Sequence, residues 1–328
     1  MVRPLVSICI PTFNGARWIR ECLTSALAQS YQPIEILVVD DGSTDGTVEL
    51  VQSLKDERTR VIVNEQNQGM VHCWNKCIEL ARGEFVKFLF QDDVLYPDCT
   101  EQLMRLFLLN GKLGLVFAPR DIIVEGDVGD EGTQAWLKNS SVLHTRFDSI
   151  DTINDGRGLF AQYLRKGFWG NWIGEPSSVL LRKEFVSRLG LFNENLYQVC
   201  DIEMWLRIMF FYDVGFIPEK LSALRFHPDS MSHTNIRSRR NCLDQLWLLT
   251  NLLSVREIKA AHPEIESIRG VELLRFIKTF LGSPLAVARC LRTDPVGRRG
   301  LRLLPTWAKS AAGYALSRPF RRAPVHEM

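Results

Sequence analysis

The sequence predicts an α/β fold built on a mainly parallel sheet. Short apolar runs alternate with segments of helical periodicity through the first 118 residues, which is the pattern of successive βαβ units. With 328 residues the chain is long enough to bury a large core. Its 46% hydrophobic and 24% charged residues are ordinary values for a globular protein, so disordered, collagen-like and coiled-coil classes are excluded.

The predicted elements follow one another in a regular order. Five short apolar runs are expected to be strands: Val6–Ile10, Glu35–Val39, Arg60–Val63, Phe85–Phe90 and Leu113–Ala118. Four intervening segments have apolar residues three and four apart and are expected to be helices: Arg17–Gln29, Thr47–Leu54, Met70–Ala81 and Cys99–Leu109. Right-handed crossovers would gather the loops that follow the strands along one edge of the sheet, where such sheets bind ligands.

Beyond Pro119 the pattern is less regular. Gly126–Asn139 is rich in glycine and acids and is expected to be a loop or lid. The remaining expected elements are a helix over Leu159–Ile173 that ends in aromatic residues, a strand over Ser177–Leu181, an amphipathic helix over Ile202–Phe211, and helices from Ile236 onward. We therefore expect one domain over residues 1–234, with halves 1–118 and 119–234, and a C-terminal helical appendage over residues 235–328.

The cysteines indicate a reducing compartment. The eight of them are scattered and form no Cys-x-x-Cys pair. Cys73 and Cys77 would share a helical face, but no second Cys or His pair completes a zinc site. Reduced, structural cysteines suit a cytoplasmic protein. Met1–Pro4 leaves no room for a signal peptide, and no apolar run reaches the roughly 20 residues of a membrane span, so we expect a soluble or surface-bound protein.

Two acidic pairs are the strongest functional signal. Asp40 and Asp41 directly follow the second predicted strand, and Asp92 and Asp93 follow the fourth. At the ends of neighbouring parallel strands, these carboxylates would converge on the ligand-binding edge. Adjacent like charges need a compensating cation or donor groups, and a divalent ion shared with substrate phosphates is a natural solution. The alternative is that both pairs only cap helices and start turns, as Asp45 is expected to do.

Three segments of the sequence resemble family 2 glycosyltransferases. They are Val-Ser-Ile-Cys-Ile-Pro-Thr-Phe-Asn at 6–14, Val-Val-Asp-Asp-Gly-Ser-Thr-Asp at 38–45, and Gly-Glu-Phe at 83–85 leading to Gln-Asp-Asp at 91–93. The resemblance covers residues 4–232. It implies the Rossmann-like GT-A fold, a mixed and mainly parallel sheet flanked by helices. It also implies transfer of a sugar from a nucleotide-diphosphate sugar to a saccharide or lipid-linked acceptor, as in the synthesis of cell-surface polysaccharide or glycolipid.

The resemblance further implies roles for individual residues. Asp41 would contact the base or ribose, Asp92 the sugar or ribose, and Asp93 a Mg²⁺ or Mn²⁺ ion on the diphosphate. Phe90 stands where many family members have the first acid of an Asp-x-Asp motif, although the two remaining carboxylates suffice to bind a metal–diphosphate. The full nucleotide-sugar site implied by the resemblance comprises Pro11, Thr12, Phe13, Asp40, Asp41, Asn75 and Asp92.

A third acidic site begins the helix predicted over residues 202–211. Asp201 and Trp205 are four residues apart and share one helical face. The acid that matches Asp201 resembles the catalytic base of the family, in which Glu often precedes it where this chain has Cys200. An inverting transfer needs a carboxylate that removes the proton of the acceptor hydroxyl, and inversion itself is implied only by the resemblance. A helix N-terminal acid favoured by the helix dipole is the alternative.

Two further patches complete the predicted site. The aromatic and small residues of 170–178 suit the wall of an acceptor site, to which we assign Trp172, Glu175 and Trp205, with ordinary packing as the alternative. The segment 227–233 resembles the family segment that closes over the diphosphate, so His227 is a second candidate metal ligand. Two other functions stay open: a nucleotidyltransferase, although residues 11–16 offer only Gly15 and no Lys for a phosphate loop, and an inactive sugar-binding relative.

The formal net charge of +2 hides an uneven distribution. Residues 275–328 carry a net charge of +9, and the remainder of the chain carries −7. The near-neutral total gives no support for nucleic-acid binding. A basic helical tail with interleaved apolar side chains favours peripheral contact with an anionic membrane beside a lipid-linked acceptor. A solvated helical cap and a protein-docking face are the alternatives.

Overall fold

The computed structural model describes residues 3–126, 139–167, 170–228, 243–282 and 302–312, together with residues 134, 137 and 230. The chain divides into two compact units, one of Met1–Glu194 with Cys200–Ser230 and the other of Asn195–Val199 with Met231–Met328. The domain boundary expected at residue 234 falls outside the described residues and stays a prediction. Across the described ranges, none of the helices combines the length and apolar character needed to cross a membrane.

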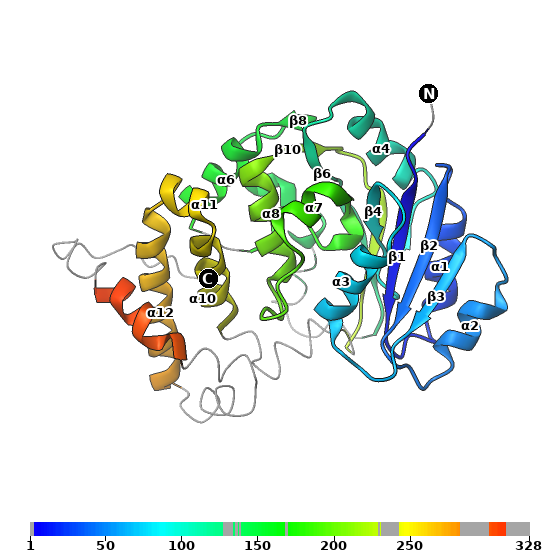
Figure 1. The fold of residues 1–328 in the computed structure, drawn as a ribbon, viewed down its shortest axis with the longest axis horizontal. Coiled ribbons are helices and arrows are strands. Elements are labelled where there is room, and N and C mark those ends of the chain that lie inside the picture. Colours follow the sequence, from blue (N-terminus) through cyan, green and yellow to red (C-terminus); the bar gives the residue numbers. More distant parts are fainter. Residues whose placement is uncertain are drawn as a thin grey trace. The chain divides into compact units, whose positions relative to one another are not determined.

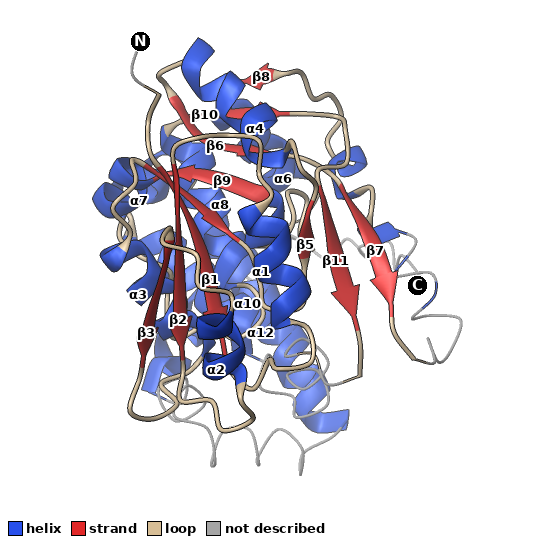
Figure 2. Ribbon diagram, turned by 90° about the vertical axis from the view of Figure 1, so that its right-hand side faces the viewer, coloured by secondary structure: helices blue, strands red, loops and turns tan. Residues whose placement is uncertain are grey.

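An eight-stranded mixed sheet forms the centre of the first unit (Figures 1 and 2). The strand order is β3-β2-β1-β4-β9-β6-β10-β8, and β9 and β8 run against the other strands. The sheet is therefore mixed and mainly parallel, as the sequence predicts. The strands are β1 (Val6–Thr12), β2 (Ile34–Asp40), β3 (Thr59–Val63), β4 (Phe85–Phe88), β6 (Leu113–Phe117), β8 (Ile153–Asn154), β9 (Val179–Arg182) and β10 (Asp213–Phe216).

Helices pack on the first strands of the sheet. Ile8 and Ile10 of β1 belong to the same apolar cluster as Ile19 and Leu23 of α1, and α3 also packs on β1 and β2. Burial on both faces explains why β1 and β2 are continuous apolar runs. The helices of this unit are α1 (Ile19–Leu27), α2 (Thr47–Ser53), α3 (Met70–Leu80), α4 (Cys99–Leu109), α6 (Gly156–Arg165), α7 (Lys183–Leu189) and α8 (Cys200–Phe211).

A second, three-stranded sheet was not expected from the sequence. It has the order β5-β11-β7, and its strands are β5 (Val94–Leu95), β11 (Ser222–Phe226) and β7 (Arg120–Val124) (Figure 2). β11 is parallel to β7 and antiparallel to β5. Because β5 directly follows Asp93 and β11 directly precedes His227, this sheet brings two distant parts of the chain together.

The structure corrects two expectations. The helix expected over Leu159–Ile173 ends at Arg165, because Gly167 takes the left-handed conformation (φ +91°) that closes helices. Phe168 and Trp169 lie outside the described residues, and the backbone over 170–173 is irregular. The acidic pairs also do not follow neighbouring strands, since β1 lies between β2 and β4.

The second unit is helical in its described parts. It contains α10 (Asp244–Ser254), α11 (Arg256–Ala261), α12 (Glu264–Gly282) and a further helical segment over residues 302–312 (Figure 1). Trp307 is fully buried with its ring edge-on to Trp247 at 6.1 Å, and its Nε1 donates to the Thr250 hydroxyl at 2.9 Å. A Cβ at Gly270 would lie 2.6 Å from the carbonyl oxygen of Ser310, so α12 and the last described helix need glycine to approach this closely.

Candidate active site

The first acid of the Asp40-Asp41 pair is a structural centre. Asp40 is fully buried at the end of β2. Its Oδ1 accepts the backbone N–H groups of Gly42 (3.1 Å) and Ser43 (2.8 Å). Its Oδ2 accepts the hydroxyl groups of Thr12 (2.9 Å) and Ser43 (2.5 Å). The carboxylate therefore ties the end of β1 to the turn after β2, as the turn-forming alternative predicted.

Asp41 orders the connection between β3 and α3. Its Oδ1 accepts from the Asn64 amide (2.7 Å) and from the Gln68 N–H (2.9 Å), and its Oδ2 accepts from the Gly69 N–H (2.8 Å). It is 3% exposed. Asp45, in contrast, accepts the N–H of Thr47, the first residue of α2, so it orders the turn before this helix, whose N-cap is Gly46 and not Asp45.

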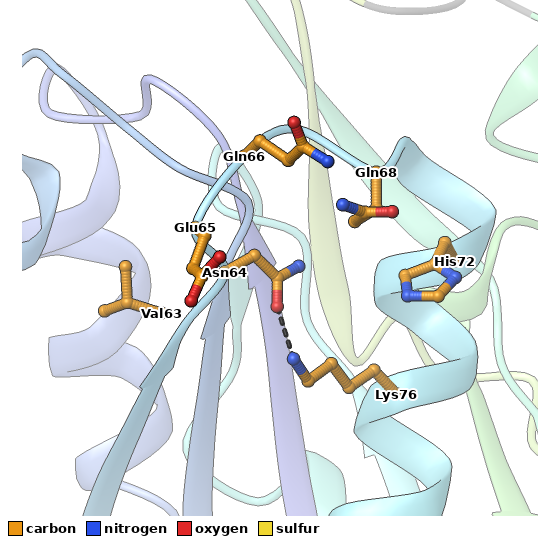
Figure 3. Close-up of a pocket in the computed structure, with 7 residues that line it drawn as sticks. All are labelled: Val63, Asn64, Glu65, Gln66, Gln68, His72 and Lys76. Carbon is orange, nitrogen blue, oxygen red and sulfur yellow. Dashed lines mark hydrogen bonds between the residues drawn. The ribbon is translucent and has the colours of Figure 1, made fainter.

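A polar cavity lies beside the Asp41-bound connection (Figure 3). Its volume is about 400 Å³. Lys76 of α3 donates to the Asn64 side chain, so Asn64 joins the cavity wall to Asp41 (Figure 3). The lining residues are Val63, Asn64, Glu65, Gln66, Gln68, His72 and Lys76. None of them was among the candidate site residues, although the amide-rich run at 64–67 was a signal that could have marked this cavity.

The loops after β1 and β4 are joined by Gln91. The backbone N–H of Phe13 donates to Gln91 Oε1 at 2.8 Å, and Gln91 Nε2 donates back to the Phe13 carbonyl at 3.2 Å. The ring of Phe13 is 40% exposed. Pro11, which precedes Thr12, is half-buried in β1. Side chains therefore link the carboxyl ends of β1, β2 and β4. The partly exposed side chain of Phe13 lies beside these links.

The side chain of Asn75 is hydrogen-bonded to the protein backbone. Its Nδ2 donates to the carbonyl of Phe192 at 2.9 Å, and its Oδ1 accepts the N–H of Phe192 at 2.9 Å. Trp74 then stacks on Phe90 (4.9 Å, 22°) and meets Phe192 edge-on (5.3 Å). Phe192 in turn lies 6.1 Å from the ring of Trp205 in α8. An aromatic cluster therefore links the β4 loop to the helix that carries Asp201.

The second acidic pair differs from the first in having an unused buried oxygen. Asp93 is fully buried; its Oδ1 accepts the N–H of Arg225 at 3.0 Å, and its Oδ2 has no partner in hydrogen-bonding geometry among the described residues, although the nearby Ser177 side chain acts to lower the pKa of the carboxyl group. Burial, followed by the charges of Asp92 and Glu175, raises the pKa of Asp93 well above its usual value. The Asp92 carboxylate lies 3.0 Å from His227 Nε2, and the buried Nδ1 of His227 lacks a partner among the same residues.

Arg225 was not predicted and organises this acidic corner. Its Nε donates to the carbonyl of Asp92 at 2.8 Å. Its two other nitrogens pair with Glu21 and Glu125, and Glu125 also accepts from the indole of Trp18. The sequence offers no signal for these contacts, because Arg225 lies 132 residues from Asp93 and meets it only through the small sheet.

Asp201 stands at the start of α8 and is 8% exposed. Its Oδ2 accepts from the Asn171 amide at 2.9 Å, and its Oδ1 from the N–H of Ile202 at 2.7 Å. Burial, with a smaller contribution from the negative charge of Glu175, raises its pKa to about 7. A carboxyl group that titrates near neutrality is suited to general base chemistry at that pH.

The expected acceptor residues surround Asp201. Trp205, one turn further along α8, donates its indole N–H to the carbonyl of Gly174 at 2.9 Å. Glu175 pairs with the buried Arg120 at 2.7 Å. Its charge acts on Asp93 as well as on Asp201, so it lies within electrostatic range of both. Trp172 is 4% exposed and meets the ring of Phe147 edge-on at 5.0 Å, which is the packing role that was the alternative for this residue.

The carboxylates of Asp92 and Asp93 fit a divalent ion that is shared with a ligand. Within the described ranges, no group of three or more His, Cys, Asp or Glu residues is arranged to hold a metal by itself. A buried carboxylate oxygen without a partner needs a proton or a cation, and Mg²⁺ commonly takes only one or two carboxylates when substrate phosphates supply further oxygens. The donor set is therefore suited to an ion bound together with a diphosphate.

The helix-flanked, mainly parallel sheet with acidic residues beyond its carboxyl edge is the architecture of the GT-A fold, and the family match supplies the reaction class. The chain matches the family model described as glycosyl transferase family 2 over residues 7–189, and it belongs to that family. It is therefore a glycosyltransferase, and a nucleotidyltransferase is no longer an alternative.

Relatives and solved structures agree with this assignment. The chain is 35% identical to an uncharacterized protein of Mycobacterium tuberculosis, covering 79% of this chain and 80% of that one. It is 32% identical to an uncharacterized glycosyltransferase of Rickettsia felis over 74% of this chain but only 38% of that protein's length.

The fold is similar to that of S. aureus TarS 1-349 in complex with UDP-GlcNAc, with a TM-score of 0.57, 17% identity and coverage of 96% and 81% of the two chains. It is also similar to the mannosyltransferase PcManGT from Pyrobaculum calidifontis in complex with GDP-Man and Mn²⁺, with a TM-score of 0.55, 17% identity and coverage of 97% and 89%.

Proposed function

We propose that the protein transfers a sugar from a nucleotide-diphosphate sugar to a saccharide or lipid-linked acceptor with inversion at the anomeric carbon, and that Asp201 is the base. The observation that carries this proposal is the buried carboxyl group of Asp201, whose pKa of about 7 is set mainly by burial and whose Oδ2 is held by Asn171. Family membership supplies the reaction class, and the described contacts supply the candidate residues.

The donor would bind along the carboxyl edge of β1, β2 and β4. The nucleotide would lie against Pro11, Thr12 and Phe13, near the segment that Asp41 orders. The cavity of Figure 3 is next to this segment and offers amide donors and acceptors of the kind that recognise a nucleobase or ribose. Asp40 and Asn75 would act by holding the walls of this site, because their polar atoms already bind the protein. The structures of relatives with UDP-GlcNAc and GDP-Man fit a donor of this class.

Asp93 would hold a Mg²⁺ or Mn²⁺ ion on the donor diphosphate, with Asp92 and His227 beside it. A bound divalent ion would offset the negative charge that develops on the departing diphosphate. The partnerless Oδ2 of Asp93 supports this assignment. Arg225 would keep the pair in place, since it contacts both residues through Nε and its backbone N–H.

At the acceptor, Asp201 would take the proton of the attacking hydroxyl group. The hydroxyl oxygen forms a bond to the anomeric carbon, the bond from that carbon to the diphosphate oxygen breaks, and the electron pair leaves with the nucleotide diphosphate. Glu175 and Trp205 would form part of the acceptor wall, with Trp172 supporting it from behind. Chondroitin and hyaluronan synthases of Pasteurella multocida are each 37% identical to this chain over 115 residues, 35% of this chain and 12% of theirs, and their names favour a saccharide product.

Donor binding and donor turnover test this proposal. We would measure thermal shifts and hydrolysis of UDP-GlcNAc, UDP-glucose, UDP-galactose and GDP-mannose, with Mn²⁺ and with EDTA. A ligand present at 100 times its Kd raises the free energy of unfolding of the protein by about 2.7 kcal/mol. We expect one donor to stabilise the protein and to be hydrolysed only with metal, and Asp93→Ala to lose both effects. Asp148→Asn is the control, because Asp148 is an exposed acid paired with Lys166. Binding of a donor without turnover would favour an inactive sugar-binding relative, and absence of both binding and turnover across the panel would contradict the proposal.

Peripheral membrane contact through residues 275–328 stays a separate proposal. Leu274 and Ile277 of α12 are 46% and 42% exposed, and the basic residues Arg275 and Lys278 adjoin them. Trp307 is unavailable for insertion because it is fully buried. Co-sedimentation with anionic vesicles should fall for Leu274→Glu with Ile277→Glu, and it should be unchanged for the exposed Leu109→Glu. Equal sedimentation of all three proteins would leave the cap or protein-docking alternatives.

A further inference from the structure

Asn171 has two separate tasks in the structure. Its Oδ1 accepts the backbone N–H groups of Ile173 (3.1 Å) and Gly174 (2.8 Å), which shapes the loop at 171–175. Its Nδ2 donates to Asp201 Oδ2 at 2.9 Å. Two N–H donors at one end fix which end of the amide is oxygen, so the other end must be the donor that faces Asp201.

The loop and the helix are fastened together at a second point. Trp205 lies one turn after Asp201 and donates to the carbonyl of Gly174. Gly174 has a positive φ of +125°, and a Cβ there would lie 3.1 Å from Ser178, so the loop is constrained where Trp205 meets it. Arg146 adds a third contact by donating to the Asn171 carbonyl at 2.9 Å. The Asn171 amide is therefore presented to Asp201 by a constrained loop.

We propose that Asn171 is a positioning residue for the reaction, which orients the Asp201 carboxylate and stabilises its charged form through the Nδ2 donor. This inference rests on the proposed role of Asp201 as the base. An amide that donates to a carboxylate favours the ionised state, and in a buried site it opposes the cost of desolvation. Without this donor, the pKa of Asp201 would rise further, so a smaller fraction of the carboxyl group would be ionised at pH 7 and able to accept the proton of the acceptor.

The other charges around Asp201 act through space. Glu175 raises the pKa of Asp201 and Arg120 lowers it. Tyr163 of α6 lies near enough for the Asp201 charge to raise its own pKa, and it donates to the carbonyl of Gly170. Asn171 and the backbone N–H of Ile202 differ from these groups in bonding directly to the carboxylate.

The substitution Asn171→Asp separates the two tasks. Its retained oxygen still accepts from Ile173 and Gly174, so the loop is kept, but a second carboxylate oxygen replaces the donor that faces Asp201. Two carboxyl groups in contact titrate as a pair with at least one raised pKa. Because the new carboxylate would itself act on Asp201, the comparison also needs Asn171→Ala, which removes the donor without adding a charge.

The experiment compares pH–rate profiles for hydrolysis of whichever donor of the panel turns over. We expect Asn171→Asp to lower kcat at pH 7 by about tenfold or more, which corresponds to a shift of at least one pKa unit. It should leave KM for the donor unchanged and recover kcat at pH 9. Asn171→Ala should shift the acidic limb in the same direction. The control is Asn110→Asp, a turn residue after α4 whose Oδ1 accepts the N–H of Lys112.

Each outcome decides the inference. A wild-type profile for Asn171→Asp overturns it, as does a folded variant that stays inactive at pH 9. If Asp201→Asn hydrolyses the donor like the wild type, the proposed base is wrong and this inference falls with it. NMR titration of protein labelled with ¹³C-aspartate gives a readout that does not depend on activity. The carboxyl signal of Asp201 is the one that disappears in Asp201→Asn. This signal should titrate at higher pH in Asn171→Ala than in the wild type, and an unchanged titration contradicts the inference.

Discussion

The ring of Phe90 stacks on that of Trp74 with centroids 4.9 Å apart and planes 22° apart. The family resemblance led us to expect the first acid of an Asp-x-Asp motif at residue 90, and in this chain the side chain at that position packs on Trp74. The residue contributes packing to a cluster that continues through Phe192 to Trp205. The acidic corner therefore consists of Asp92 and Asp93 alone along this loop.

Phe90→Leu should destabilise the protein by about 0.5–1.5 kcal/mol, the usual contribution of an aromatic pair beyond its buried area. Urea unfolding measures this change. Phe13→Leu is the control, because that ring is 40% exposed and surface changes usually stay within about 0.5 kcal/mol. Equal stability of the two variants would show that the Phe90–Trp74 contact contributes nothing.

Asp40→Asn and Asp92→Asn should separate structural from ligand-binding carboxylates. Asp40 is fully buried and accepts four hydrogen bonds, so an amide there leaves donors facing donors and should cost about 1.5–3 kcal/mol of unfolding free energy. The side chain of Asp92 is 21% exposed and contacts His227, so Asp92→Asn should lower the unfolding free energy by less. Asp92→Asn should instead weaken donor-dependent stabilisation with Mn²⁺. A larger loss of stability for Asp92→Asn would reverse these roles.

The raised pKa of Asp201 makes stability depend on pH with a definite sign. Its folded pKa of about 7 lies above the ordinary 3.8, so the folded state binds more protons between these values and loses stability as pH rises through this window. Asp201→Asn removes the effect. Between pH 4 and pH 8 the stability of the variant should therefore rise relative to the wild type by about 4 kcal/mol, at about 1.4 kcal/mol per pKa unit.

The substitution also changes the packing around residue 201, but this change costs the same free energy at pH 4 and at pH 8. It therefore cancels when the two pH values are compared. The measurement is urea unfolding of both proteins across the range. Asp148→Asn, with its exposed carboxylate, should show no rise of this kind. A pH-independent difference between Asp201→Asn and the wild type would mean that Asp201 titrates as an ordinary acid.

Trp307→Phe should weaken the second unit by about 2 kcal/mol, because the hydrogen bond to Thr250 is lost and the smaller phenyl ring leaves a cavity. Trp307→Ala should cost about 3–5 kcal/mol, as expected for a large buried aromatic side chain. Amide hydrogen exchange in α10 and α12 measures the loss locally. Unchanged protection in Trp307→Ala would contradict a core formed around this residue.

The βαβ part of the fold was predictable because its periodicity is local. Each of β1 to β4 is an apolar run whose partners are set by the general rules for parallel sheets. β5 and β8 were missed because two residues have no period to detect, and β7, β10 and β11 were missed because they lie beyond Pro119, where strands and helices no longer alternate regularly. The premature end of α6 at Arg165 depends on the backbone conformation of Gly167.

The site was predictable where residues act next to each other in the sequence. The acids of residues 40–45, 92–93 and 201 could be found from their places after strands and before a helix. Sequence patterns could not distinguish Asp40, whose oxygens are all used by the protein, from Asp93, which keeps one oxygen without a partner among the described residues. Arg225 and Asn171 were missed because their contacts, 132 and 30 residues away, exist only after folding.

The most direct test of the central claim is the effect of Asp201→Asn on transfer from the donor that the panel identifies. General base catalysis contributes about 10²- to 10⁴-fold, so kcat should fall by that factor while the thermal shift by donor and Mn²⁺ stays unchanged. The wild-type kcat should rise with pH up to about 7, following the carboxyl group of Asp201. A folded Asp201→Asn variant with wild-type kcat would contradict the assignment of Asp201 as the base.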